Sequence, residues 1–169
     1  MSRAVAEKVA AACDNAGATT AVVTADDGVT AWARGLGLEV IAEPAGGGLD
    51  GAAHAAATEA LKRGLGWCIV HADLPFLTPG DVARVVEPLG RGAVVLAPSR
   101  DGGTNLLAAT TPVAFAYGPG SFARHLAATR GFERRVVVTL GTAFDLDTPE
   151  DLVGAAALPG GAWLRDYLS

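Results

Sequence analysis

Acidic residues at two distant places are the strongest sign of chemistry in this chain. Asp73 closes the apolar run 67–72, and Asp145 and Asp147 lie in "DLDTPED" (145–151). Carboxylate oxygens are hard ligands that suit a divalent cation. Asp145 and Asp147 alternate, so on an extended stretch their side chains share one face. Loop decoration explains any one of them equally well, but together they predict a metal site with one of Asp145 and Asp147 directed at the metal.

The residues after these carboxylates have a structural explanation. "TPGD" (78–81) and "TPED" (148–151) each place Thr at a helix N-cap, Pro at the first helical position and an acid three residues later. This arrangement forms a capping box, in which the Thr and the acid satisfy backbone N–H groups reciprocally. We therefore expect a helix to begin at both places. The capping does not account for the acids that precede it.

Two glycine-containing segments could contact an anion. In "APSRDGGTNLL" (97–107), a Gly-Gly turn lets the backbone approach a ligand closely beside the Thr104 hydroxyl. Taken alone, an ordinary tight turn explains this segment better. In "YGPGSFARH" (117–125), a loop precedes Ser121, which we expect to N-cap a helix. The free N–H groups of a helix N-terminus form an anion site, and this second segment strengthens the prediction.

The histidines offer weaker signals. His125 lies four residues after Ser121 and could face the same site, but a core or surface position is the better explanation. His54 lies in an Ala-rich helical stretch and His71 in the strand before Asp73, and we interpret both as structural. The glycine-rich segment 46–52 could run along a nucleotide, but it does not match the P-loop pattern.

Short apolar strands alternate with helical stretches along the chain. Strands are expected at 20–25, 38–43, 67–73 and 92–99, and helices at 3–15, 26–37, 51–64 and 78–90. This alternation predicts an α/β fold, a three-layer α/β/α sandwich with a mostly parallel, Rossmann-like sheet. Ligands in such sheets bind beyond the carboxyl ends of the strands, where Asp73 falls. No linker or repeat divides residues 1–169, so we expect one domain.

The composition excludes several classes of protein. Half of the 169 residues are hydrophobic and only 18% are charged, which is typical of a folded domain. A net charge of −5 without any Lys/Arg block argues against nucleic-acid binding. No apolar run reaches transmembrane length and no signal peptide is recognisable, so we expect a cytoplasmic protein without membrane contact. Cys13 and Cys68 fit no zinc spacing and are expected to be buried, reduced thiols.

Four motifs occur in an order and spacing that identify a family. "HADLPFLTP", "APSRDGGTNLL", "YGPGSFARHLA" and "DLDTPEDL" together resemble the guanylyltransferases of deazaflavin coenzyme F420 biosynthesis. These act on 2-phospho-L-lactate or phosphoenolpyruvate and belong to a superfamily that includes molybdenum-cofactor guanylyltransferases. The resemblance covers roughly residues 1–155. It implies a fold of the nucleotide-diphospho-sugar transferase type and the transfer of GMP from GTP to the phosphate of a phospho-carboxylate.

The resemblance also implies roles for individual residues. Asp73 and Asp145 look like catalytic Mg²⁺ ligands, with Asp147 as the alternative to Asp145. Thr104, Gly118 and Ser121 look like the residues that bind the acceptor's carboxylate. The attacking phosphate is already anionic, so the reaction needs no general base. Catalysis would come from positioning and from neutralising the charge of the triphosphate.

The chain departs from the family in two respects. Family members begin with a strand and a basic nucleotide loop, whereas here Met1 opens directly onto a helical stretch. We expect the sheet to lack that first strand, which leaves backbone groups unpaired or paired with another chain, for example in a homodimer. Asp50 stands where the family tends to have Asn. The alternative to an active enzyme is a truncated or non-catalytic homologue that binds a phospho-carboxylate or a partner protein.

Overall fold

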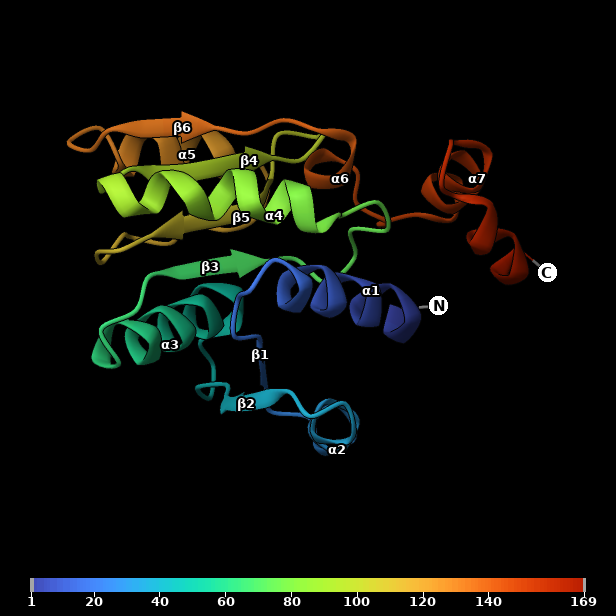
Figure 1. Cartoon of the computed structure of the whole chain (residues 1–169), viewed down its shortest axis with the longest axis horizontal. Coiled ribbons are helices and arrows are strands. Elements are labelled where there is room, and N and C mark those ends of the chain that lie inside the picture. The colour runs from blue at the N-terminus through green and yellow to red at the C-terminus, as the bar shows by residue number, and fades with distance from the viewer. Residues whose placement is uncertain (1, 169) are drawn as a thin grey trace.

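The computed structural model describes residues 2–168, which form two β-sheets flanked by helices. One sheet pairs β1 (Ala21–Thr24) with β2 (Glu39–Ala42) in parallel. The other has the order β3-β5-β4-β6, built from β3 (Trp67–Val70), β5 (Thr104–Ala109), β4 (Val94–Pro98) and β6 (Arg134–Val136). In Figure 1 these strands run from β6 at the top through β4 and β5 to β3, and β1 and β2 lie below β3.

Helices cover both faces of the four-stranded sheet and so form three layers. On one face, α1 (Ser2–Asn15) and α4 (Pro79–Val86) pack with Leu106 and Val95. On the other, α3 (Gly48–Lys62) and α5 (Ser121–Ala128) pack with Leu96 and Leu107. The side chains of β4 and β5 are almost entirely buried, as expected for strands covered on both faces. The remaining elements are α2 (Asp27–Gly35), α6 (Leu140–Ala143), α7 (Pro149–Ala157) and the 3₁₀ segments Glu87–Arg91 and Ala162–Tyr167.

The prediction of a mostly parallel sheet holds only in part, because the four-stranded sheet is mixed and β5 runs against its other strands. β5 runs antiparallel to both β3 and β4, while β4 and β6 are parallel. The cause is local: β4 and β5 are joined by the turn Ser99–Gly103, where the Ser99 N–H donates to the Gly103 carbonyl at 3.1 Å. So short a connection can form only a hairpin, because a parallel crossover needs a dozen residues or more.

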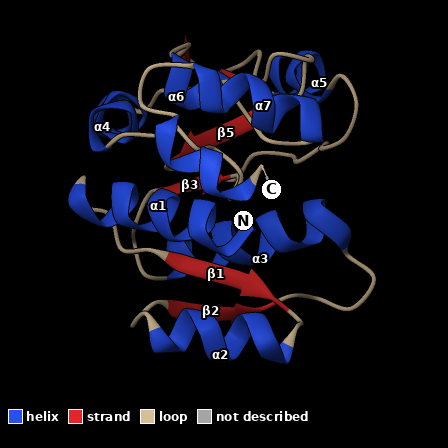
Figure 2. Cartoon of the chain, turned by 90° about the vertical axis from the view of Figure 1, so that its right-hand side faces the viewer, coloured by secondary structure: helices blue, strands red, loops and turns tan. Residues whose placement is uncertain are grey.

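The two sheets present edges to one another. Among residues 2–168, β1 pairs only with β2 and β3 only with β5. Helix α3 contacts both β1 and β3 and thereby connects the two sheets, and Figure 2 shows α1 and α3 at the level between them. The expectation that the sheet lacks a first strand stays a prediction.

The helix starts confirm the capping interpretation. Thr78 and Thr148 each accept a hydrogen bond from the backbone N–H of an aspartate three residues later, Asp81 and Asp151, and both capping boxes are complete. The helix predicted at 78–90 ends earlier, at Val86, and continues as a 3₁₀ turn. Pro88 lies in that turn, and its missing N–H is one reason why the α-helix stops. Within the described residues no helix has the length and apolar character needed to cross a bilayer.

The two cysteines are free thiols in the core between α1 and the sheet. Burial, with the nearby Asp14 carboxylate, raises the pKa of Cys13 to about 11. Burial raises the pKa of Cys68 as well. Because the thiolate is the reactive form, we expect both cysteines to react at pH 8 at least about 100-fold more slowly than in the unfolded chain. Iodoacetamide labelling with and without denaturant measures this, and native labelling at the unfolded rate would contradict the packing described.

Candidate functional site

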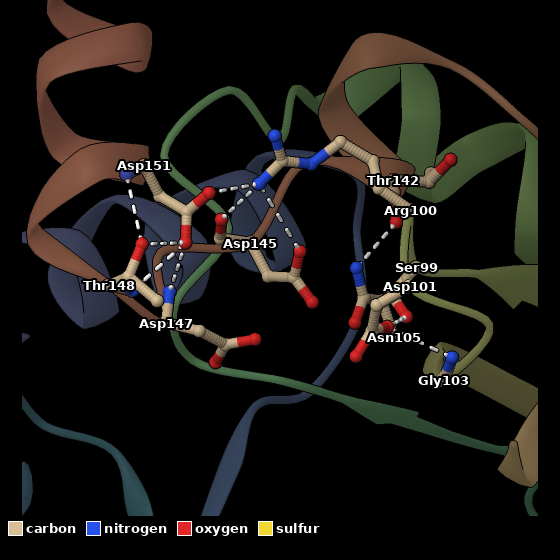
Figure 3. Close-up of polar contacts among 10 residues, drawn as sticks. All are labelled: Ser99, Arg100, Asp101, Gly103, Asn105, Thr142, Asp145, Asp147, Thr148 and Asp151. Atoms are coloured by element: carbon tan, nitrogen blue, oxygen red, sulfur yellow. Dashed lines mark hydrogen bonds and ion pairs between the residues drawn. The ribbon is translucent and has the colours of Figure 1, made fainter. Parts of the chain in front are cut away.

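The sequence-predicted carboxylates meet at one edge of the four-stranded sheet. Asp73 follows β3, and its backbone carbonyl accepts a hydrogen bond from the N–H of Leu146 at 3.1 Å. This bond places Asp73 beside the segment that carries Asp145 and Asp147. Asp145 is 7% exposed, whereas Asp147 is an exposed residue. In Figure 3 the carboxylates of Asp145 and Asp147 extend to the same side of their segment.

The pKa values of these carboxyl groups record a concentration of negative charge. Burial raises the pKa of Asp73, the nearby His71 opposes the rise, and the Asp147 charge adds to it. Burial also raises the pKa of Asp145, and the charges of Asp147, Asp73 and Asp101 raise it further. Neighbouring negative charge therefore makes the ionisation of Asp73 and Asp145 harder, an effect that a bound cation would reverse.

An unpartnered oxygen makes Asp73 the best-marked candidate ligand. Its Oδ1 is buried and has no hydrogen-bond partner among the described residues. A buried carboxylate oxygen without a partner is costly unless something else binds it. No group of three or more His, Cys, Asp or Glu side chains within residues 2–168 could hold a metal ion. Asp73 and Asp145 are the two buried carboxylates that could contribute to a cation site here, and Mg²⁺ is usually bound through one or two carboxylates with waters or substrate phosphates as its other ligands.

Arg100 holds the Asp145 segment in place, a role that no sequence pattern indicates. Its Nη2 donates to the Asp145 backbone carbonyl at 3.1 Å and to Asp151 Oδ1 at 2.7 Å, and lies 3.9 Å from Asp145 Oδ1 (Figure 3). The guanidinium also lies over the Phe144 ring, 3.7 Å from its centroid. The hydrogen bond from Arg100 lowers the pKa of Asp151. These contacts join the end of β4 to the start of α7, a tertiary pairing that no local pattern encodes.

The second part of the site is a pair of buried hydroxyls. Thr104 opens β5 and Ser121 opens α5, and both are at most 2% exposed. Their oxygens are 3.1 Å apart and share a hydrogen bond. The structure thus brings together Thr104 and Ser121, which lie on separate elements. Ser121 does not N-cap α5, contrary to our expectation: Gly120, with φ +70°, is the N-cap, and the Ser121 hydroxyl is directed to Thr104 instead.

The side chains of Arg124 and Asp50 hold the loop that precedes α5 in place. Arg124 donates to the carbonyls of Ala116, Tyr117 and Pro119. Gly118, the third predicted acceptor residue, is exposed and has φ +106°, a left-handed conformation that favours glycine. Asp50 Oδ1 accepts from the Tyr117 N–H at 2.7 Å. Asp50 therefore anchors this loop from α3, a role that an asparagine carbonyl could also perform.

Comparisons with known proteins identify the family of this chain. The family model described as "Guanylyl transferase CofC like" matches residues 1–169. The chain belongs to this family. The chain is 40% identical over 146 residues to a phosphoenolpyruvate guanylyltransferase of Rubrobacter xylanophilus, covering 82% of this chain and 71% of that protein. It is 32% identical over 159 residues to a 2-phospho-L-lactate guanylyltransferase of Methanothermobacter thermautotrophicus, covering 87% and 67%.

Two further comparisons bear on the acceptor and the fold. A 3-phospho-D-glycerate guanylyltransferase of Phenylobacterium zucineum is 38% identical over 157 residues, covering 88% of this chain and 71% of that protein. The chain spans only 66% of a phosphoenolpyruvate guanylyltransferase of Sphaerobacter thermophilus. A solved structure from Desulfovibrio desulfuricans G20, assigned to the nucleotide-diphospho-sugar transferases, superposes with a TM-score of 0.77 at 16% identity. It covers 98% of this chain and 80% of that one, which shows that the fold is shared.

Proposed function

We propose that this protein transfers GMP from GTP to the phosphate of a small phospho-carboxylate, with release of pyrophosphate and dependence on Mg²⁺. The observation that carries the proposal is that Asp73 and Asp145, like the Thr104 and Ser121 hydroxyls, lie at the edge of the four-stranded sheet where β3 and β4 end and β5 begins. Membership of the CofC-like guanylyltransferase family supports it. The named relatives act on different acceptors, and all of these carry a phosphate and a carboxylate.

The reaction requires the protein mainly to position GTP and the acceptor. An oxygen of the acceptor phosphate attacks the α-phosphorus of GTP, a new P–O bond forms, and the bond to the bridging oxygen of pyrophosphate breaks. The attacking phosphate is already ionised, so no side chain has to remove a proton. Mg²⁺ would supply charge neutralisation on the phosphate oxygens, held by Asp73 and Asp145. The buried Asp145, held by Arg100 through its backbone, suits this role better than the exposed Asp147.

Thr104 and Ser121 are proposed to bind the acceptor. Two hydroxyls that share one hydrogen bond have a second proton available for an anionic oxygen. Gly118 completes this side of the site, since its conformation shapes the loop that leads to Ser121, whose N–H donates to the Gly118 carbonyl at 3.0 Å. A site built from hydroxyls and a loop can accept phosphoenolpyruvate, 2-phospho-L-lactate or 3-phospho-D-glycerate, and the acceptor's remaining shape decides among them.

The Thr104→Val variant tests the acceptor role, because valine keeps the shape and loses the hydroxyl. We expect the KM for the acceptor to rise about 10- to 100-fold, the loss of one hydrogen bond to a charged group. The KM for GTP should stay unchanged. Thr110→Val, at an exposed position just after β5, is the matched control. An equal rise in both KM values would show that Thr104 supports the fold of the whole site rather than the acceptor.

Pyrophosphate release from GTP with each of the three acceptors tests the function. We expect release with at least one acceptor, and none when Mg²⁺ is removed by EDTA. If all three fail while one of them still binds in calorimetry, the protein is a non-catalytic phospho-carboxylate binder. If none is turned over and none binds, the proposal is wrong for this chain.

A further inference from the structure

His125 makes hydrogen bonds through both of its ring nitrogens while completely buried. It lies in α5 and is 0% exposed. Its Nε2 accepts from the backbone N–H of Ala116 at 2.9 Å, and its Nδ1 lies 2.9 Å from Thr104 Oγ1. The Tyr117 ring packs edge-on against the imidazole, with centroids 4.9 Å apart. This one side chain therefore connects the loop before α5 to the hydroxyl at the start of β5.

The hydrogen bond from the Ala116 backbone N–H determines which imidazole nitrogen of His125 carries the proton. A peptide N–H can only donate, so Nε2 must present its lone pair to Ala116. A neutral ring then carries its proton on Nδ1, and Nδ1 donates to Thr104 Oγ1. Burial lowers the pKa of His125, the Arg124 and His71 charges lower it further, and Asp50 opposes them, which keeps the ring in the neutral form that this bonding requires.

The direction of this bond controls what Thr104 and Ser121 can offer a ligand. When His125 donates to Thr104, the hydroxyl protons of Thr104 and Ser121 are both free of a hydrogen bond to the histidine. One proton then joins the two oxygens, which are 3.1 Å apart, and the other is left to donate outward. If Nδ1 accepted instead, the Thr104 proton would be spent on the ring. The tautomer therefore leaves the pair of hydroxyls with a donor for an anion.

We propose that His125 is a positioning residue for the acceptor: its Nδ1–H tautomer, imposed by the Ala116 backbone, leaves the Thr104–Ser121 pair with one hydroxyl proton to donate toward the acceptor's anionic group. The inference rests on the proposed function, because it deepens the account of the same site. His125 does not touch the reacting atoms and acts through Thr104. Arg124, which holds the carbonyl of Ala116 at 2.9 Å, keeps the backbone N–H of the same loop in place.

Two substitutions of His125 distinguish a role in positioning Thr104 from a role in packing alone. In His125→Asn, the side-chain amide nitrogen takes the position of Nδ1 and can still donate to Thr104. In His125→Gln, the amide reaches further, toward Ala116, and the donor beside Thr104 is lost. We expect the acceptor KM to stay within about threefold in His125→Asn and to rise about 10- to 100-fold in His125→Gln, with the GTP KM unchanged in both. Thermal unfolding of both variants reports their stability separately.

Imidazole nitrogen NMR of the wild-type protein gives a readout that does not depend on turnover. We expect the spectrum of His125 at neutral pH to show a protonated Nδ1 and an unprotonated Nε2. A protonated Nε2 overturns the proposal, and so does an acceptor KM that rises equally in the two variants. If the wild-type protein turns over no acceptor, the proposed function itself fails and the acceptor role of His125 fails with it. Turnover with the wrong KM pattern overturns only the role of His125.

Discussion

Replacing Asp73 with asparagine should reduce GMP transfer by about 1000-fold and leave the fold intact. Asparagine keeps the size of the side chain but removes the charge that would hold the cation. Asp73 Oδ1 is buried without a partner among the described residues, so this oxygen makes no hydrogen bond within them that stabilises the fold. Burial raises the pKa of Asp73, so the folded state binds the proton more tightly than the unfolded chain does, and ionisation costs stability above the usual aspartate pKa. The variant should therefore unfold at the same temperature or higher near neutral pH.

Initial rates of pyrophosphate release at saturating GTP and acceptor measure the first effect, and thermal unfolding measures the second. Asp27→Asn, in the first turn of α2, is the control and should keep the wild-type rate. A Mg²⁺ titration should show that extra metal does not rescue Asp73→Asn. A variant rate within tenfold of wild type would contradict the metal role of Asp73, and a large drop in stability would mean that Asp73 supports the fold.

Replacing Gly141 with alanine should destabilise the protein by about 2–3 kcal/mol and also lower activity. Gly141 is buried in α6, where an added Cβ would clash with the Asp81 carboxylate and lie 2.7 Å from the Phe76 carbonyl. Neither neighbour can move freely, since Asp81 is bound in the capping box of α4 and Phe76 O belongs to the backbone. The clash would push the segment after Asp73 away from the segment before Asp145.

Chemical denaturation of Gly141→Ala measures the loss of stability. Gly154→Ala, in α7, is the matched control, because nothing lies within 4 Å of its added Cβ. That variant should be unchanged or more stable by about 0.5–1 kcal/mol, as helix interiors prefer alanine to glycine. Wild-type stability in Gly141→Ala would show that the segments carrying Asp73 and Asp145 are not packed as closely as described.

The features that the sequence predicted well are those that a few neighbouring residues determine. The capping boxes at Thr78 and Thr148 depend on residues three apart in the chain, and both are present. The position of Asp73 at the ligand-binding edge of the sheet was predictable because Asp73 directly follows a strand. In an α/β sheet, ligands bind beyond the carboxyl ends of the strands. The pairing of Asp73 with the Asp145 segment needed the family resemblance as well, because seventy-odd residues separate them in the sequence.

The features that the sequence did not predict depend on tertiary packing or on one competing residue. The antiparallel course of β5 follows from a short turn after β4, which the apolar pattern of the strand does not reveal. Gly120 displaced Ser121 as the N-cap because its left-handed conformation ends the loop one residue earlier. The bond between Arg100 and Asp151 joins side chains with no shared local pattern. His125 had one signal, its spacing of four residues from Ser121, but spacing alone does not distinguish a site residue from a core residue.

Phosphorus NMR of the reaction products tests the central claim most directly. The protein would be incubated with GTP, Mg²⁺ and each of the three phospho-carboxylates. The account predicts two coupled phosphorus resonances of a new diphosphate, one from the guanosine phosphate and one from the acceptor, together with free pyrophosphate. If the spectra show only unchanged GTP, or GMP without a phosphorus coupled to it, then this site does not join GMP to the acceptor's phosphate and the account is contradicted.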